Sequence, residues 1–266
     1  MADQTREAGS KLNPLRALGG SLFRPRRAMA ALSEAPRRRW WIPLLLTLAA
    51  LAMQGTAYAR ADHELMYRHQ LAWFESMSEM EKGPGAEPPT KTDPHPLNVW
   101  LPIGGRAVGT LITWLIWAGL ITLATTFLGH NGARFRATFA MVAWSKLPLA
   151  VRHLVQFIAM SATGSAIYNQ GLSGLALDST PRVPDFSFGP RSYAPPARGS
   201  AVLAALLGQI DVYVIWSLVL TAAGIWAFAH MPKRRAWLVT LGIWIVTVAV
   251  TLIPPLLGMG QGVNLF

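Results

Sequence analysis

The chain has 266 residues, of which 52% are hydrophobic and 14% are charged, and its formal net charge is +11. Soluble domains carry about 25% charged residues, so this composition argues against an ordinary soluble domain. The chain contains no cysteine, which excludes disulfides, thiolate metal sites and cysteine nucleophiles. The basic residues gather in the first 39 positions and near the ends of apolar stretches. Attraction to anionic lipid head groups explains that distribution better than nucleic-acid binding does.

Residues 1–39 are predicted to form a basic cytosolic tail. Leu15, Leu18 and Leu22 share one helical face and have arginines among them, which is typical of an amphipathic segment lying in the membrane interface. A disordered tail with incidental leucines is the alternative. In the interfacial interpretation a set of basic side chains contacts lipid head groups, namely Arg24, Arg26, Arg27, Arg37, Arg38 and Arg39.

Five apolar stretches follow, each long enough to cross roughly 30 Å of hydrocarbon as a helix that rises about 1.5 Å per residue. We predict an all-α, polytopic membrane domain over residues 40–266, with spans at about 40–59, 107–128, 137–162, 209–230 and 236–257. Two long loops, about 60–106 and 163–208, separate some of these spans. Basic residues crowd the tail and the connectors 129–136 and 231–235. The positive-inside rule therefore places the N-terminus in the cytoplasm, and the long loops and the C-terminus outside.

Ionisable side chains within the spans require a partner, because each costs at least about 2.5–3.5 kcal/mol near the bilayer centre. Lys146 and Arg152 lie in the third predicted span, and Asp211 lies near the outer end of the fourth. If the third helix runs outward, Arg152 reaches the depth of Asp211. We therefore predict an ion pair between these two helices, with Gln156 and Arg106 beside it. Two alternatives stay open: the basic side chains extend to opposite interfaces, or the charged groups line an ion or substrate pathway.

Two features predict how the spans bend and pack. Pro148 interrupts the third span, because it lacks a backbone N–H and crowds the carbonyl group four residues earlier. Gly105 and Gly109 in the second span have the small-xxx-small spacing that permits close helix packing, as do Ala223 and Ala227 in the fourth.

Catalytic and metal-binding motifs are weak in this chain. His63 and Glu64 begin like a zinc-protease motif, but Tyr67 stands where the second histidine is required. Ser145 and His153 are about two turns apart on one predicted helix, too far for a hydrogen bond between a nucleophile and its base. We therefore predict no enzymatic activity, no metal and no cofactor.

Several stretches resemble the Yip1 domain family. Residues 134–148 are similar to one pattern of the family, in which Pro148 is the matching proline. The more specific match is residues 207–224, with Asp211, Trp216, Ser217 and Gly224 at the corresponding positions. The resemblance covers the tail and all five spans, although the first, second and fifth match only in apolar character. Lys146 and the long Pro-rich outer loops depart from the family pattern.

The resemblance implies a five-helix integral membrane fold with a cytosolic N-terminus. The short tail and long outer loops resemble a bacterial member, which implies the cytoplasmic (inner) membrane. Eukaryotic members act in vesicle traffic and contact small GTPases, and some bacterial relatives occur alongside ABC exporters. We therefore expect a non-enzymatic scaffold or accessory subunit that binds other integral membrane proteins, in an ABC-type export assembly. The alternative is a channel or transporter with its own polar pathway through the helices.

Overall fold

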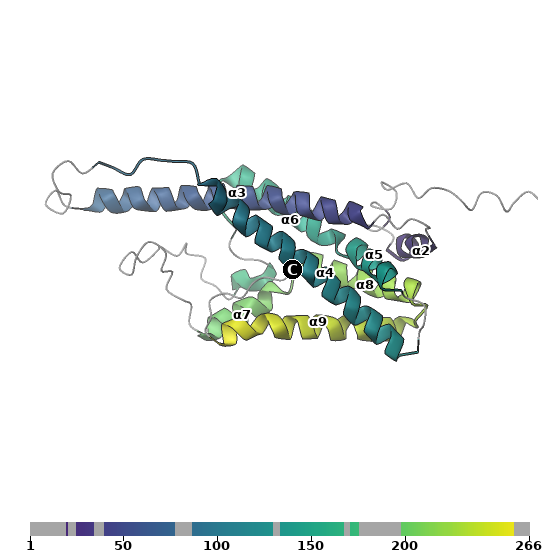
Figure 1. The fold of residues 1–266 in the computed structure, drawn as a ribbon. Coiled ribbons are helices and arrows are strands. Elements are labelled where there is room, and N and C mark those ends of the chain that lie inside the picture. Colours follow the sequence, from purple (N-terminus) through teal and green to yellow (C-terminus); the bar gives the residue numbers. More distant parts are fainter. Residues whose placement is uncertain are drawn as a thin grey trace, which may run out of the picture. The chain divides into compact units, whose positions relative to one another are not determined.

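The computed structural model describes residues 20, 25–34, 40–77, 87–129, 134–167, 171–175 and 198–257. Within these ranges the regular structure is helical and contains no strand. The order of the helices along the chain is α2, α3, α4, α5, α6, the short 3₁₀ helix η2, α7, α8 and α9 (Figure 1). This all-α architecture agrees with the predicted fold class.

The first predicted span belongs to a much longer helix, α3 (Trp41–Ser76), which has 36 residues. At about 1.5 Å per residue its length is about 54 Å, well beyond the roughly 30 Å of a hydrocarbon core. Residues 60–76 continue the helix because they contain neither Gly nor Pro and are rich in helix formers. An ion pair of 3.0 Å between Arg68 Nε and Glu64 Oε1, one turn apart, adds support.

The predicted loop at 60–106 is consequently shorter than expected. α4 (Pro96–Phe127) already begins at Pro96, where proline suits the first helical position because that N–H has no partner in the helix. Pro102 also lies inside the first turns of α4. Hydropathy marks where apolar character ends, whereas α3 continues into polar sequence, and α4 begins in a stretch that contains Pro102, Gly104 and Gly105.

The third predicted span consists of two helices, α5 (Phe135–Ser145) and α6 (Leu147–Thr163). The break falls at Lys146, whose φ of −87° and ψ of 0° are not helical. Pro148 is the second residue of α6 and has no N–H to donate, so the interruption that the sequence predicts at Pro148 is confirmed. The Leu149 N–H restarts the hydrogen bonding by donating to the Lys146 carbonyl oxygen at 3.0 Å.

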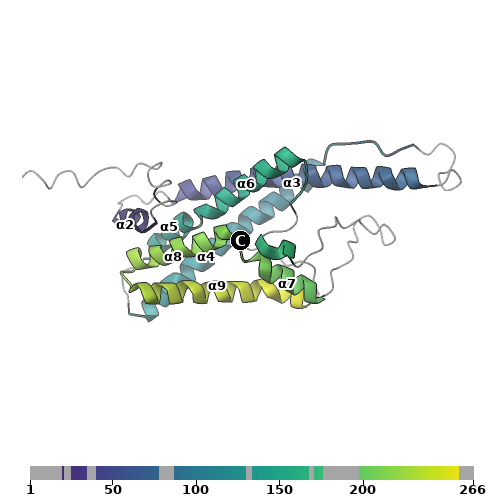
Figure 2. The same ribbon diagram turned by 180° about the vertical axis from the view of Figure 1, so that it is seen from behind.

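The fourth predicted span corresponds mainly to α8 (Val212–Phe228), which follows a shorter helix, α7 (Arg198–Gly208). The chain bends by 55° between α7 and α8. The 3₁₀ helix η2 (Gly171–Leu175) packs against α7, as Figure 2 shows from behind. Part of the predicted loop at 163–208 is therefore helical. The fifth predicted span corresponds to α9 (Lys233–Leu256).

Three helices of the described chain are long and apolar enough to cross a membrane: α3, α4 and α9. The number becomes four if the bent pair of α7 and α8 forms one span. α5 and α6 have 11 and 17 residues, and each alone is shorter than the 20 or so residues that a span usually needs. The count of five spans stays a prediction.

The helices fall into two compact units. Unit 1 comprises Met1–Leu46, Ile112–Leu149 and Tyr213–Thr247. In unit 1, α2 (Pro25–Glu34) packs against α5. The largest buried side chains of unit 1 come from four different helices and include Met29, Trp114, Trp117, Trp144 and Ile225.

Unit 2 comprises Thr47–Leu111, Ala150–Val212 and Val248–Phe266. Its buried apolar side chains include Leu51 of α3, Ile103 of α4, Met160 of α6 and Ala204 of α7. α3 and α4 approach closely in unit 2, since a Cβ added to Gly55 would lie 2.5 Å from Cγ1 of Ile103. Glycine at position 55 therefore allows these two helices to touch.

Candidate functional site

The structure places Arg152 and Asp211 together in unit 2. Arg152 projects from α6, and Asp211 is the residue immediately before α8. Arg152 Nη1 donates a hydrogen bond of 3.4 Å to Asp211 Oδ2. The two side chains are only 3% and 10% exposed. Of the five residues in the predicted intramembrane cluster, these two are brought into contact.

The backbone around Asp211 is fixed by short-range hydrogen bonds at the bend between α7 and α8. The N–H of Gln209 donates to the Leu206 carbonyl, and the N–H of Ile210 donates to the Leu207 carbonyl, at 3.1 and 3.0 Å. The Ile210 carbonyl in turn accepts a hydrogen bond of 3.2 Å from the N–H of Leu172 in η2. The segment that presents Asp211 to Arg152 is thus held by both α7 and η2.

Gly171 is required for this arrangement. Its φ of +56° lies in the left-handed region, and an added Cβ would lie 2.7 Å from the Ile210 carbonyl oxygen. A side chain at position 171 would therefore push η2 away from the bend. The sequence does not indicate this role, because a glycine in a Gly- and Ser-rich stretch gives no signal of what its backbone will meet.

Because the Arg152–Asp211 pair is buried, its contribution to the free energy of folding differs from that of an exposed pair. Removing one partner of a buried pair typically costs about 3–5 kcal/mol, because the other charge is left uncompensated. Replacing both partners by apolar residues is often neutral or stabilising. The pair is therefore suited to fixing how α6 meets the bend before α8, more than to adding net stability.

Two other predicted members of the cluster, Gln156 and Arg106, have environments of their own. Gln156 is half-buried on α6, and its Oε1 has no hydrogen-bond partner in the part of the chain that the structure describes. Arg106 is exposed on α4, with its guanidinium carbon 5.8 Å from the centre of the Tyr58 ring. The contact of Arg106 with the ion pair stays a prediction.

Lys146 occupies the break between α5 and α6 and belongs to unit 1. It is 2% exposed, and its Nζ lies 3.7 Å from the centre of the Trp117 ring. A cation over an indole face is stabilised by about 0.5–2 kcal/mol, with the larger values at buried sites. Lys146 and Arg152 are both buried, so neither follows the alternative in which the basic side chains extend out to the interfaces.

Small residues bring α5 and α8 together in unit 1. A Cβ added to Gly224 of α8 would collide with the side chain of Met141 in α5. Thr221 Oγ1 lies 3.1 Å from Ser145 Oγ and 2.8 Å from the Ser217 carbonyl oxygen, and all three residues are buried. By contrast, no atom of the described residues lies within 4 Å of a Cβ added at Gly105 or Gly109. The spacing of these two glycines permits close packing, but no described helix uses it.

The zinc-like motif forms a different set of contacts. Glu64 Oε2 pairs with Lys91 Nζ at 2.6 Å, and His63 Nε2 lies 2.6 Å from the Thr92 carbonyl oxygen. The hydrogen bonds from Lys91 and Arg68 lower the pKa of the Glu64 carboxyl below its ordinary value. No group of three or more potential metal-ligating side chains gathers within the described ranges.

Two basic residues of unit 1, Arg26 and Lys233, lie beside the Trp226 ring. Arg26 is one of the predicted head-group contacts, whereas Lys233 is not. Arg26 and Arg27 are exposed on α2, whereas Arg24, Arg37, Arg38 and Arg39 lie outside the described residues. The guanidinium carbon of Arg26 is 5.9 Å from the centre of the Trp226 ring, and Lys233 Nζ is 5.3 Å from the same centre. The block of basic residues at 233–235 was visible in the sequence only as a sign of orientation.

The model of the Yip1 domain family matches residues 19–253, which is nearly the whole chain. The chain belongs to the Yip1 domain family. No curated protein and no solved structure matches it. Membership in the family, together with the apolar helices α3, α4 and α9, makes this chain a multi-pass integral membrane protein that lies in a lipid bilayer.

The Yip1 resemblance had singled out five positions, and the structure gives each a definite environment. Pro148 follows the helix break, Asp211 pairs with Arg152, and Gly224 meets Met141. Trp216 is half-buried and Ser217 is buried, both on α8. Three of the five therefore lie where two helices touch or where a helix breaks, which is consistent with a role in building the membrane domain.

Proposed function

We propose that this Yip1 family protein is a non-enzymatic membrane scaffold that binds partner membrane proteins outside the hydrocarbon. The observation that carries the proposal is the length of α3. Its 36 residues span about 54 Å, so a helix that crosses roughly 30 Å of hydrocarbon projects beyond it by about 24 Å. A projecting, ordered helix offers a surface to other proteins.

The projecting part of α3 is supported by the chain that follows it. Lys91 pairs with Glu64, and the Thr92 carbonyl contacts His63. These contacts hold the segment before α4 against the polar half of α3. The same half exposes Trp73, and the first turns of α4 expose Trp100 and Leu101. Tryptophans are enriched at the centres of protein interfaces, which supports this region as the surface for a partner.

Within the apolar stretches the exposed surface is different. The exposed large side chains of α4 between residues 111 and 123, and those of α9 between 245 and 253, are aliphatic. Hydrocarbon can cover such faces without a protein partner. The proposal therefore places the partner surface on residues 60–76 and the start of α4.

The proposal includes five spans, with α5 and α6 together as the third. Broken helices are tolerated at membrane depth where they are buried in protein, and α5 is buried from Ala137 to Ser145. The basic tail and the connectors at 129–136 and 231–235 support a cytoplasmic N-terminus and an outer C-terminus. The membrane that we propose is the bacterial cytoplasmic membrane.

The partner class that we propose is the integral membrane subunits of an ABC-type export assembly. That choice is an analogy with bacterial relatives, whereas the projecting helix is a feature of this chain. The experiment below is therefore designed to test the surface first and the identity of the partner second.

Photo-crosslinking in membranes tests the scaffold. A photoreactive amino acid replaces Trp73 or Trp100 on the proposed surface, and Val246 on the aliphatic face of α9 serves as the control position. Adducts with one integral membrane protein are expected from positions 73 and 100 and not from 246, with the export subunits identified among them by mass spectrometry. Equal adducts from all three positions, or adducts with lipid only, would contradict the proposal.

A channel or transporter is the second candidate, and the buried Arg152–Asp211 pair favours it because charged residues inside membrane proteins often mark substrate or ion pathways. Purified chain in liposomes distinguishes the two functions. The scaffold proposal expects no ion or solute flux above that of protein-free liposomes. Flux that disappears in the Asp211→Asn variant would establish transport and overturn the scaffold as the primary function.

A further inference from the structure

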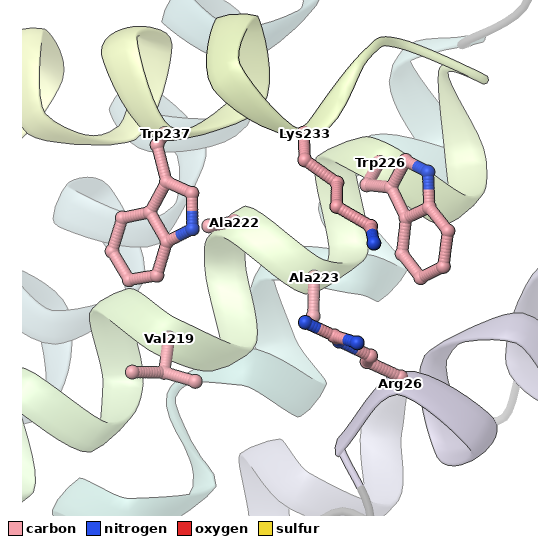
Figure 3. Close-up of a pocket in the computed structure, with 7 residues that line it drawn as sticks. All are labelled: Arg26, Val219, Ala222, Ala223, Trp226, Lys233 and Trp237. Carbon is pink, nitrogen blue, oxygen red and sulfur yellow. The ribbon is translucent and has the colours of Figure 1, made fainter.

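A small pocket opens in unit 1 between α2, α8 and the beginning of α9 (Figure 3). Its lining contains two basic, two aromatic and three small apolar side chains, namely Arg26, Lys233, Trp226, Trp237, Val219, Ala222 and Ala223. The cavity has a volume of about 90 Å³. Liquid water occupies about 30 Å³ per molecule, and pockets that enclose a whole organic ligand measure about 300–1,000 Å³. The space therefore suits one small group.

Two positive charges face this pocket. Arg26 extends from α2 and Lys233 from the start of α9, and in Figure 3 both side chains reach toward the same space beside Trp226. Their charged ends lie 5.9 and 5.3 Å from the centre of the Trp226 ring. An aromatic ring attracts each cation but does not neutralise it, so the two like charges still repel each other.

No described acidic side chain compensates these two charges. Neither Arg26 nor Lys233 forms an ion pair within the described chain. The segments 112–149 and 213–247, which supply most of unit 1, contain no aspartate or glutamate at all. An external anion is the natural counter-charge for such a pair, and an arginine next to a lysine is a common way to bind phosphate.

We propose that this pocket binds the phosphate group of an anionic phospholipid. The lipid is favoured over a dissolved anion because the charged side chains adjoin apolar walls, Val219 and Ala222, and a partly exposed Trp237. A phospholipid has both a phosphate for the two basic side chains and apolar chains for the apolar part of the lining. Tryptophan and basic residues at the ends of membrane helices are also typical of the head-group region. The site is independent of the scaffold proposal, since it needs a lipid and no protein partner.

Binding of a fluorescent, short-chain phosphatidylglycerol to the full chain in neutral detergent micelles tests the proposal. The variant Arg26→Gln with Lys233→Gln removes both charges from the pocket. The matched control, Arg234→Gln with Arg235→Gln, removes two charges from exposed residues of α9 that do not line the pocket. We expect the pocket variant to bind at least about tenfold more weakly, and the control variant to stay within about threefold of the unchanged chain.

Two further measurements separate the pocket from general charge and from a dissolved anion. Ala223→Leu keeps both charges but fills the space, and the same loss of phosphatidylglycerol binding is expected. Arg26→Lys with Lys233→Arg keeps the charge and is expected to retain binding, which guards against a misfolded pocket variant. Unlabelled phosphatidylglycerol should compete for the site, whereas phosphatidylcholine and inorganic phosphate should not.

Three results would overturn the proposal. Equal losses in the pocket and control variants would show that only diffuse charge attracts the lipid. Unchanged binding in Ala223→Leu would show that the cavity is not occupied. Competition by inorganic phosphate at the concentrations where the lipid binds would assign the pocket to a dissolved anion.

Discussion

Lys146 of unit 1 and Arg152 of unit 2 are buried basic side chains from the same predicted span, and their charges are compensated in different ways. In unit 2 Arg152 donates to the Asp211 carboxylate, so the charge has a partner of opposite sign. In unit 1 Lys146 lies over the Trp117 ring, and the helices around it are packed closely through Gly224 and the Ser145–Thr221 contact. We infer that unit 2 depends on a specific charge pair, whereas unit 1 depends on close packing.

The largest effect is expected when the charge pair in unit 2 is broken. Asp211→Ala leaves the Arg152 guanidinium buried without its carboxylate, which should lower the free energy of unfolding by about 3–5 kcal/mol. Asp93→Ala removes the same charge from an exposed position in unit 2 and should change it by less than about 0.5 kcal/mol. Reversible unfolding in mixed micelles measures both values. Similar small effects in the two variants would show that the ion pair does not matter to unit 2.

The next largest effect is expected when a side chain is added where α5 and α8 touch in unit 1. Gly224→Leu places a side chain where Met141 already lies, and overpacking of this kind costs about 1–3 kcal/mol. Gly105→Leu adds the same side chain where no atom of the described residues lies within 4 Å of the new Cβ. The same unfolding measurement is expected to show a clear loss for the first variant and almost none for the second. The reverse order would contradict the importance that we give to packing between α5 and α8.

A smaller effect is expected at Lys146 itself. Lys146→Met removes the charge with little change in shape, and Trp117→Leu removes the ring. The coupling free energy of the two substitutions in a double-mutant cycle should be about 0.5–2 kcal/mol in favour of the cation–π contact. A coupling of zero would mean that the ring only fills space near the ammonium group.

The smallest effect concerns the exposed contacts along α3. Hydrogen bonds from Lys91 and Arg68 lower the pKa of Glu64, so these contacts are fully present above the ordinary carboxyl pKa of 4.5 and are lost as the pH falls through the lowered value. Spin labels on cysteines introduced at Arg60 and Glu87 report the separation of α3 from the following segment. A narrow distance distribution is expected at pH 7, with broadening only below the ordinary pKa of Glu64, and Glu64→Gln should remove this pH dependence. Broadening near neutral pH would contradict the assignment.

The sequence predicted the parts of this structure that depend on local composition. The apolar stretches, the break near Pro148 and the all-α class follow from hydropathy and from the missing proline N–H. Hydropathy could not predict that α3 continues to Ser76, because helix formation does not end where apolar character ends. It also could not distinguish Gly224, where an added Cβ would meet Met141, from Gly105, where it would meet none of the described residues.

The sequence allowed a contact of the candidate site to be predicted only where acidic residues are rare. Asp211 is the one acidic residue between residues 186 and 266, so a matching depth was enough to select Arg152 as its partner. The contacts of Lys146 with Trp117 and of Lys233 with Trp226 could not be selected in this way, because the chain contains 11 tryptophans. A spacing pattern does not indicate which ring faces which cation, because that depends on how separate helices pack.

Exchange of the two charges in unit 2 tests the central claim most directly. Arg152→Asp and Asp211→Arg each place two like charges together, and both single variants should unfold far more readily than the unchanged chain. The double variant restores a pair of opposite charges, so we expect it to recover at least half of the lost free energy of unfolding. A double variant that is no more stable than either single variant would contradict the claim that this pair fixes α6 against the bend before α8.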